Sequence, residues 1–229
     1  MSLTVHHLQA SQSERIPWLC EELQIPYSLK LHQRAPIFSP RSIEDLNPLG
    51  QAPVIQDGSL TMAESAACVE YIIRVHGDGK LALLPSHRNF ADYLYWFHFA
   101  NGTLQPHVLL LLQLSRLDNT GESGPYARSV ERFRKMLALM DARLVENTWL
   151  AGDEFTAADI MTVFTLTTMR MFYPFDLTGY QGILRFLQSV SCREGYRKAR
   201  ANADPGLETM IEGKAPRSFM ERLKAEGKI

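Results

Sequence analysis

The chain has 229 residues, 45% of them hydrophobic, and a formal net charge of −1 at neutral pH. This length suits one large domain or two small ones, and the apolar content is enough for a sizeable core. The near-zero charge gives no reason to expect nucleic acid or an acidic surface as a partner. Cys20, Cys68 and Cys192 stand far apart, which argues against a disulfide framework or a zinc site and predicts a reducing compartment.

Two features of the sequence predict a cytoplasmic protein. The N-terminus lacks a basic segment followed by an apolar one, so no secretory signal is indicated. The longest apolar run, Val108 to Leu112, is far below the ~20 residues that a membrane span needs. We therefore expect no membrane partner and no metal.

The first 80 residues mix short strand patterns with helices. In chain order the pattern predicts a strand over 3–8, a helix over 13–23, a strand over 27–31, a loop with a short helix over 34–45, strands over 54–56 and 59–61, and a helix over 64–76. Asp57-Gly58 is a strong signal for a hairpin turn between the last two strands. Gly77 and Gly79 are expected to close the last helix.

Strand signals fade after Leu81. A linker with Pro85 is predicted over 81–87, followed by helices over 89–117, 125–147, 156–172, 179–190 and 193–203, a turn-rich break over 119–124 and a charged, partly helical tail over 204–229. The first helix is expected to bend at Pro106. Thr156 and Asp159 have the spacing of a capping box, whose role is structural.

The most informative stretch runs from Leu46 to Ile55 and is followed by Glu64-Ser65. Pro53 interrupts a strand start, so it indicates an irregular or edge backbone, with a cis peptide as one outcome. The residue before it then exposes its N–H and C=O. Glu64 and Ser65 open a helix, where a ligand carboxylate is favoured. A strand edge beside a helix N-terminus predicts a site for a short peptide.

This stretch and its surroundings resemble the glutathione transferase family. The resemblance also rests on Ser11 to Arg15, on Gly50 to Val54 and on Phe155 to Ile160, and it covers nearly the whole chain. It implies an α/β thioredoxin-like domain (βαβ-α-ββα) over 1–80, a linker over 81–87 and an all-helical domain over 88–229. Ser11 and Arg15 match the spacing of serine-type, theta- or phi-like members, and Phe97 to Pro106 resembles a fungal and bacterial branch.

The resemblance implies that glutathione is the co-substrate and that its thiol reacts as a thiolate. A free thiol has a pKa of about 8.5, so few molecules are ionised at neutral pH. A hydroxyl that donates to the sulfur stabilises the anion, and a nearby helix N-terminus adds to this effect. Ser11 stands between the first strand and the first helix, where both effects are available.

Other readings of this region stay open. Ser11 or Ser13 is equally expected as an ordinary helix N-cap, and Ser13 is the alternative thiol-activating residue. His7 fills the slot at which tyrosine-type classes carry their tyrosine, and it is a further alternative as a thiol base. The absence of Cys at position 11 argues against thiol-transferase activity of the cysteine-type classes.

The resemblance also assigns the contacts of the tripeptide. Ala52 would pair with the cysteinyl unit like an added strand, with Pro53 in the cis form. Glu64 would bind the γ-glutamyl ammonium and Ser65 its carboxylate. The glycyl end would be held by Gln51 and, on a weaker alignment, by Arg41.

The electrophile is expected between the two domains, against the long helix after the linker. Aromatic and amide side chains there suit a flat or apolar substrate, and the candidates are Phe97, His98, Asn101, Gln105 and His107. Each is equally interpretable as a core or dimer contact. The resemblance further implies a homodimer.

Two hypotheses of function follow. The first is a cytosolic glutathione transferase in detoxification, which adds the sulfur to an electrophile and has hydroperoxide reduction as a sister activity. The second is a non-catalytic binding or scaffold protein with the same fold. The intact set of predicted site residues favours the enzyme.

Overall fold

The computed structural model describes residues 3–117 and 124–229, which divide into two compact units. The first unit holds the chain up to Leu83 together with Val190–Thr209 and the last two residues. The second holds Leu84–Ser189 and Met210–Gly227.

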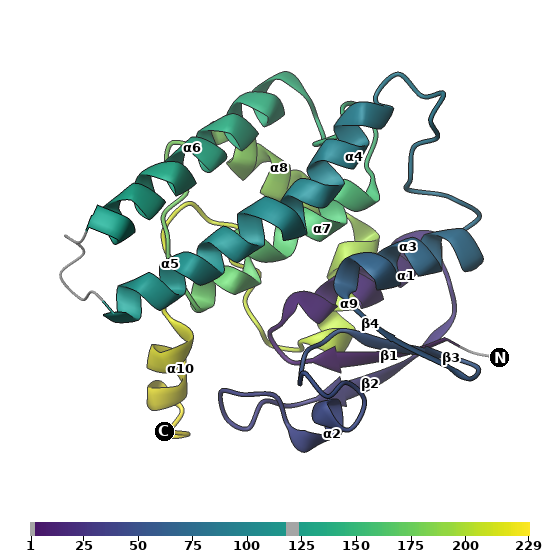
Figure 1. Cartoon of the computed structure of the whole chain (residues 1–229), viewed down its shortest axis with the longest axis horizontal. Coiled ribbons are helices and arrows are strands. Elements are labelled where there is room, and N and C mark those ends of the chain that lie inside the picture. Colours follow the sequence, from purple (N-terminus) through teal and green to yellow (C-terminus); the bar gives the residue numbers. More distant parts are fainter. Residues whose placement is uncertain (1–2, 118–123) are drawn as a thin grey trace. The chain divides into compact units, whose positions relative to one another are not determined.

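The first unit is built on a sheet of four strands in the order β2-β1-β3-β4 (Figure 1). The strands are β1 (Leu3–Leu8), β2 (Tyr27–His32), β3 (Val54–Asp57) and β4 (Leu60–Ala63). Strands β1 and β2 are parallel, whereas β3 runs antiparallel to both β1 and β4. The predicted βαβ-α-ββα order is confirmed.

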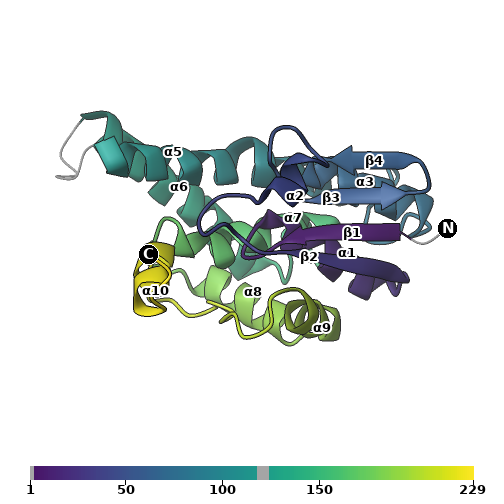
Figure 2. The same cartoon turned by 90° about the horizontal axis from the view of Figure 1, so that it is seen from below.

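The helices of this unit are η1 (Gln12–Glu14), α1 (Arg15–Leu23), α2 (Arg41–Glu44), α3 (Ser65–Val75) and α9 (Glu194–Ala203). Helix α1 packs against α3 and also against α9, which comes from the far end of the sequence (Figures 1 and 2). Gly195 permits this approach, because a Cβ at that position would lie 2.8 Å from the Glu22 side chain. The rings of Trp18 and Tyr196 meet edge to face, with centroids 4.9 Å apart.

The hairpin turn lies one residue later than the sequence predicts. Asp57 pairs with Leu60, so the two loop residues are Gly58 and Ser59, with Gly58 at φ 60°. The Asp57 carboxylate accepts hydrogen bonds from Tyr71 at 3.0 Å and from His76 at 2.7 Å. These contacts with α3 and its C-cap hold Asp57 in the strand.

The second unit is helical. Its elements are α4 (Phe90–Phe99), the π-helix η2 (Ala100–Leu104), α5 (Gln105–Leu117), α6 (Gly124–Glu146), α7 (Ala157–Leu166), η3 (Thr168–Met171), α10 (Phe219–Ala225) and α8 (Gln181–Ser191), whose last two residues belong to the first unit. Every residue of α7 is buried, and α4, η2 and η3 all pack against it. The core of this unit is therefore centred on α7, as its apolar sequence predicts.

The predicted continuous helix over 89–117 is interrupted by η2. The Gln105 N–H donates to the Ala100 carbonyl, one residue further back than in an α-helix. Pro106 has no N–H to give to the residue four positions earlier, and its ring disfavours a tight preceding turn. The wider π turn ends just before Pro106, so the irregular hydrogen bonding precedes the proline rather than lying at it.

Two further expectations for this unit need correction. The helix predicted over 156–172 ends at Leu166, and a 3-10 segment follows. In the tail only Phe219–Ala225 is helical. The preceding segment is fixed by the buried Arg170 guanidinium, which donates to the carbonyls of Phe175, Met210, Glu212, Gly213 and Lys214. These bonds replace a helical ladder, so the segment packs firmly without regular structure.

Thr156 and Asp159 join the start of α7 to the loop before it. The capping box is confirmed: Thr156 N–H donates to Asp159 Oδ2 at 2.8 Å, and Asp159 Oδ1 also accepts from Leu150 N–H at 2.9 Å. The break predicted over 119–124 lies outside the described residues, except that Gly124 begins α6. Within 3–117 and 124–229, no helix has the length and apolar character to cross a bilayer.

Candidate functional site

The end of β1 carries a line of hydrogen-bonded side chains that leads inward from Ser11. Ser11 is the N-cap of η1, and its Oγ accepts from Ser13 N–H at 3.2 Å. Its Oγ also lies 2.7 Å from Ser13 Oγ, which lies 2.9 Å from His7 Nδ1. On the other side of the ring, His7 Nε2 lies 3.0 Å from Asp204 Oδ2. Ser11 is 7% exposed, whereas Ser13 and His7 are fully buried.

Asp204 closes this line from the end of α9. Its second oxygen, Oδ1, accepts from Ala10 N–H at 2.9 Å, so the carboxylate also fixes the turn before Ser11. Burial by itself would raise the pKa of Asp204, but the His7 ring and Arg200 lower it below its ordinary value. Asp204 is therefore a carboxylate at neutral pH.

Arg15 joins three parts of the same region. Its Nη1 donates to Ser65 Oγ at 2.9 Å and to Gln12 Oε1 at 3.2 Å. The side chain is fully buried, and this burial lowers the pKa of the guanidinium to about 9 although Glu14 opposes the effect. Arg15 is thus still a cation at neutral pH, and it links the start of α1 to the start of α3.

The strand edge before β3 has the irregular backbone that Pro53 predicts. The Ala52–Pro53 peptide is cis, and Ala52 is 6% exposed. Its carbonyl accepts from Gln12 Nε2 at 3.0 Å. A carbonyl oxygen has two lone pairs, so this bond leaves Ala52 a further acceptor position.

Glu64 and Ser65 stand at the N-terminus of α3, as predicted. Glu64 is exposed and holds φ 70° and ψ 110°, a backbone conformation that L-residues rarely adopt. Ser65 is buried and is held by Arg15. Backbone strain of this kind, about 1–3 kcal/mol, concentrates at ligand-binding positions.

The two residues predicted for the glycyl end lie at the surface. Gln51 is exposed, and its carbonyl accepts from Asn47 Nδ2 at 2.9 Å. Arg41 is on α2 with its side chain 88% exposed, and its Nε lies 3.7 Å from Asp45 Oδ1. Both residues are exposed, whereas Ala52 and Ser65 are buried and held by hydrogen bonds.

Comparisons with known proteins decide the family. Residues 11–75 match the family model for the glutathione S-transferase N-terminal domain, and residues 111–194 match that for the C-terminal domain. The curated glutathione S-transferase 3 of Schizosaccharomyces pombe is 32% identical, over 91% of each chain. The chain belongs to the glutathione S-transferase family.

Solved structures agree with this membership. A glutathione S-transferase from Actinobacillus pleuropneumoniae is 27% identical, with a TM-score of 0.77 and coverage of 91% of this chain and 99% of the other. The theta class enzyme of Xanthomonas axonopodis pv. citri, solved with glutathione bound, is 21% identical, with a TM-score of 0.67 and coverage of 88% and 98%. The second likeness supports the fold alone. Enzymes of the glutathione S-transferase family use glutathione as a substrate, and this general activity extends to the present chain.

The transferase's candidate electrophile residues fall into two groups. Phe97 is 2% exposed and packs its ring against Tyr93, and His107 is buried with Nε2 2.7 Å from the Ser129 carbonyl. His98 is exposed, while Asn101 and Gln105, in or directly after η2, are half-buried. π-turns of this type are frequent at functional sites.

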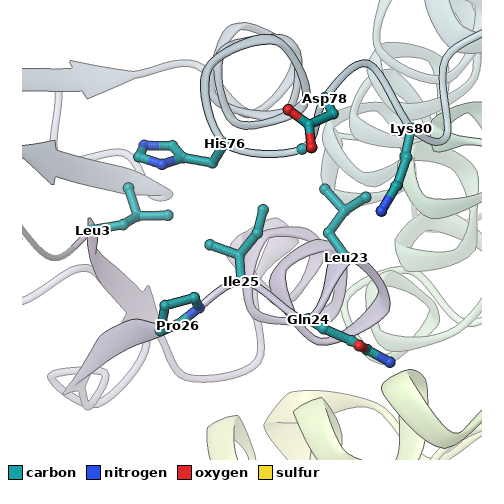
Figure 3. Close-up of a pocket in the computed structure, with 9 residues that line it drawn as sticks. Leu3, Leu23, Gln24, Ile25, Pro26, His76, Asp78 and Lys80 are labelled. Carbon is teal, nitrogen blue, oxygen red and sulfur yellow. The ribbon is translucent and has the colours of Figure 1, made fainter.

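A cavity of about 540 Å³ lies elsewhere in the first unit of this transferase (Figure 3). Leu3, at the start of β1, lines it, together with residues that end α1 and follow α3, among them Gln24, His76 and Lys80. Ser11 follows the opposite end of β1. None of the residues predicted to bind glutathione lines this cavity.

Sequence reasoning about the transferase site missed Gln12 and Asp204. Gln12 lies next to Ser11, but only the folded backbone brings its amide to the Ala52 carbonyl. Asp204 lies far along the chain, in a segment that the sequence predicts to be a charged tail. No motif in the sequence around it indicates a contact with β1. In the part of the chain that the structure describes, no group of three or more His, Cys, Asp or Glu side chains is arranged to hold a metal ion.

Proposed function

We propose that this transferase binds glutathione at the edge formed by Ala52, Glu64 and Ser65, and that Ser11 stabilises the bound thiolate for attack on an electrophile. One observation carries the proposal. Arg15 and Gln12 connect Ser65 and the Ala52 carbonyl through hydrogen bonds of 2.9 to 3.2 Å, directly beside Ser11 in the chain. The predicted peptide contacts at Ala52 and Ser65 thus belong to one hydrogen-bonded assembly, and Gln12, which is part of it, is the next residue after Ser11.

Burial ranks the three candidates for contact with the sulfur. Ser13 and His7 have no exposed surface, whereas Ser11 retains some. Of the three residues, only Ser11 therefore offers any surface to a substrate outside the protein. Ser11 sits at the N-terminus of η1 and also caps it, so its capping role and its proposed role coexist.

The contacts of the tripeptide follow the same geometry. Glu64 offers an exposed carboxylate for the γ-glutamyl ammonium, and Ser65 at the start of α3 serves the γ-glutamyl carboxylate, where Arg15 adds positive charge. Ala52 pairs with the cysteinyl unit through its backbone. Gln51 and Arg41 serve the glycyl carboxylate. We assign these contacts to a domain of residues 1–80, before the linker over 81–87.

The electrophile belongs to the helical domain over 88–229, where His98, Asn101 and Gln105 are the surface candidates and Phe97 supports them from the core. Hydroperoxide reduction is the sister activity, because the same thiolate attacks a peroxide oxygen. A detoxification role in the cytoplasm fits both reactions.

A homodimer is the proposed assembly. Tyr95 of α4 and Leu109 and Leu110 of α5 are large apolar residues with 45 to 51% of their surface exposed. Exposed apolar residues on neighbouring helical segments suit a protein interface. Sedimentation at several protein concentrations tests this part separately.

Two measurements decide between the enzyme and a non-catalytic scaffold. Retention on immobilised glutathione tests binding, and conjugation of chloro-dinitrobenzene tests turnover. The proposal expects both. Binding without any turnover, for this and for other electrophiles and peroxides, would favour the scaffold.

Replacing Glu64 with alanine is expected to weaken glutathione binding by more than about 1 kcal/mol, because a charge-assisted hydrogen bond to the ammonium is lost. Calorimetric titration measures the change. Glu70 on the same helix, whose carboxylate lies 3.6 Å from Arg74, provides the control. Glu70→Ala should bind glutathione normally, and an equal loss in both variants would refute the assigned role of Glu64.

A further inference from the structure

The line of side chains behind Ser11 has the form of a proton path, and this inference rests on the proposed function. Three successive gaps of 2.7, 2.9 and 3.0 Å connect Ser11 Oγ through Ser13 Oγ and the His7 ring to Asp204 Oδ2. All members beyond Ser11 are buried. As an N-cap, Ser11 needs only the backbone N–H of Ser13. It requires neither the Ser13 hydroxyl nor the side chains of His7 and Asp204.

Counting protons defines the state of the path when His7 is neutral. Asp204 is a carboxylate, so His7 Nε2 must carry the proton that it donates. His7 Nδ1 is then an acceptor, and the Ser13 hydroxyl donates a hydrogen bond to it at 2.9 Å in preference to the Leu8 carbonyl at 3.3 Å. Ser13 Oγ already accepts a hydrogen bond from Leu8 N–H at 3.0 Å, and its remaining lone pair accepts a hydrogen bond from the Ser11 hydroxyl. Ser11 is left with one open lone pair, which suits a thiol S–H donor.

The same count for protonated His7 reverses every bond between Ser11 and the ring. His7 Nδ1–H now donates to Ser13 Oγ, and Ser13 O–H donates to Ser11 Oγ. Ser11 Oγ also accepts from Ser13 N–H, so its own proton is released outward. In this state Ser11 is a donor, which is the form that stabilises a thiolate.

We propose that His7 is the proton acceptor for the glutathione thiol, reached through Ser11 and Ser13. The S–H bond breaks and its electron pair stays on sulfur. The thiol proton binds Ser11 Oγ as the Ser11 proton passes to Ser13 Oγ and the Ser13 proton passes to His7 Nδ1. The products are a thiolate that receives the Ser11 hydrogen bond and an imidazolium paired with Asp204. No other reactant is consumed.

The charges around His7 suit this role. The groups that face the His7–Asp204 pair from the packed elements are Arg200 of α9, Glu14 of η1, Arg34 after β2 and His32 of β2. Arg200 Nη1 lies 3.7 Å from Asp204 but 2.9 Å from Glu14, whose carboxylate offsets its charge. Burial, then His6 and His7, lower the pKa of His32, so that ring adds no cation at neutral pH. Asp204 is the charged partner in direct contact.

Nitrogen NMR of histidine-labelled protein tests the transfer directly. At a pH where His7 is neutral in the free protein, glutathione should protonate His7 Nδ1. S-methylglutathione, which has no thiol proton, should bind without this change. Ser11→Ala should abolish the response to glutathione. The same ionisation state of His7 in both complexes would overturn the proposal.

Kinetics provide a second test with matched variants. His7→Asn keeps a hydrogen-bonding amide near the Nδ1 position but accepts no proton, and Ser13→Ala breaks the path while the His7–Asp204 pair remains. Each should lower kcat/KM by about tenfold or more at neutral pH, with recovery as the pH approaches the thiol pKa of about 8.5. The double variant should be no slower than the slower single variant, since one path is broken in all three.

The control is His76→Asn, which removes another His–Asp pair of the same unit, with His76 Nε2 2.7 Å from Asp57. It should keep the parent pH profile. Multiplying effects in the double variant, or pH profiles for both single variants like that of the parent, would overturn the proton path. If Ser11→Ala alone is slow while His7→Asn and Ser13→Ala are normal, the path fails but the proposed function stands.

Discussion

Replacing Arg200 with methionine is expected to lower the free energy of unfolding by about 3–5 kcal/mol, because it leaves a buried carboxylate without its cation. Arg200 Nη1 donates to Glu14 Oε2 at 2.9 Å, and the two side chains are 8% and 5% exposed. Burial alone would lower the pKa of Arg200, but Glu14 and nearby groups raise it above its ordinary value. Arg200 is therefore a cation at neutral pH. Urea unfolding followed by circular dichroism measures the loss.

Lys198 provides the matched control on the same helix. Its Nζ lies 2.8 Å from Glu21 Oε2, but its side chain is 63% exposed. Because exposed ion pairs contribute about 0–1 kcal/mol, Lys198→Met should change the unfolding free energy by less than that. Adding Glu14→Gln to Arg200→Met should recover part of the loss, since the unpaired charge disappears. Equal effects of Lys198→Met and Arg200→Met would refute the role assigned to burial.

Local sequence signals predicted the first unit well where each element carries its own pattern. The alternation over 3–8 and the proline, glycine and acidic residues around 50–65 act over short distances, so the strands, the helix start at Ser65 and the cis Ala52–Pro53 peptide were all within reach of sequence reasoning. The hairpin was misplaced by one residue because Asp57 is held in the strand by Tyr71 and His76, which no turn rule considers.

Features that depend on distant packing were not predictable in the same way. In the π turn over 100–104, Ala100 and Leu104 keep a helical spacing of four residues, so the sequence alone shows only a helix with a proline after it. The segment before α10 is held by hydrogen bonds from Arg170 to its backbone carbonyls. A single arginine in the sequence does not predict these bonds. Helix α9 packs on α1 through Gly195, which reads in the sequence as an ordinary weak helix residue.

The candidate site divides along the same line. Ser11, Glu64 and Ser65 were predicted from motifs, since their proposed roles depend on adjacent backbone. The support behind them was not: Gln12 reaches Ala52, and Asp204 reaches His7, only after the chain has folded. The residues that hold or tune the proposed chemistry are thus the ones that sequence reasoning could not supply.

Replacing Ser11 with alanine is expected to lower turnover at least about tenfold while the protein stays folded. The hydroxyl is proposed to donate to the thiolate, and a hydrogen bond to a charged group contributes about 1.5–3 kcal/mol, which corresponds to a factor of ten or more. Ser11 Oγ also caps η1 through Ser13 N–H, so a stability loss of about 1 kcal/mol should accompany the change. Steady-state conjugation kinetics measure the loss of turnover, and the ultraviolet absorbance of bound thiolate measures the loss of thiolate stabilisation.

Ser218 separates the chemical effect from the loss of a cap. It is the N-cap of α10, and its Oγ accepts from Glu221 N–H at 3.2 Å, the same distance as in the Ser11 cap. Ser218→Ala should lose a similar amount of stability and keep the parent turnover and thiolate absorbance. A parent-like rate in Ser11→Ala would remove Ser11 from the chemistry. Because Ser13 and His7 are fully buried, a backbone N–H would then have to stabilise the sulfur.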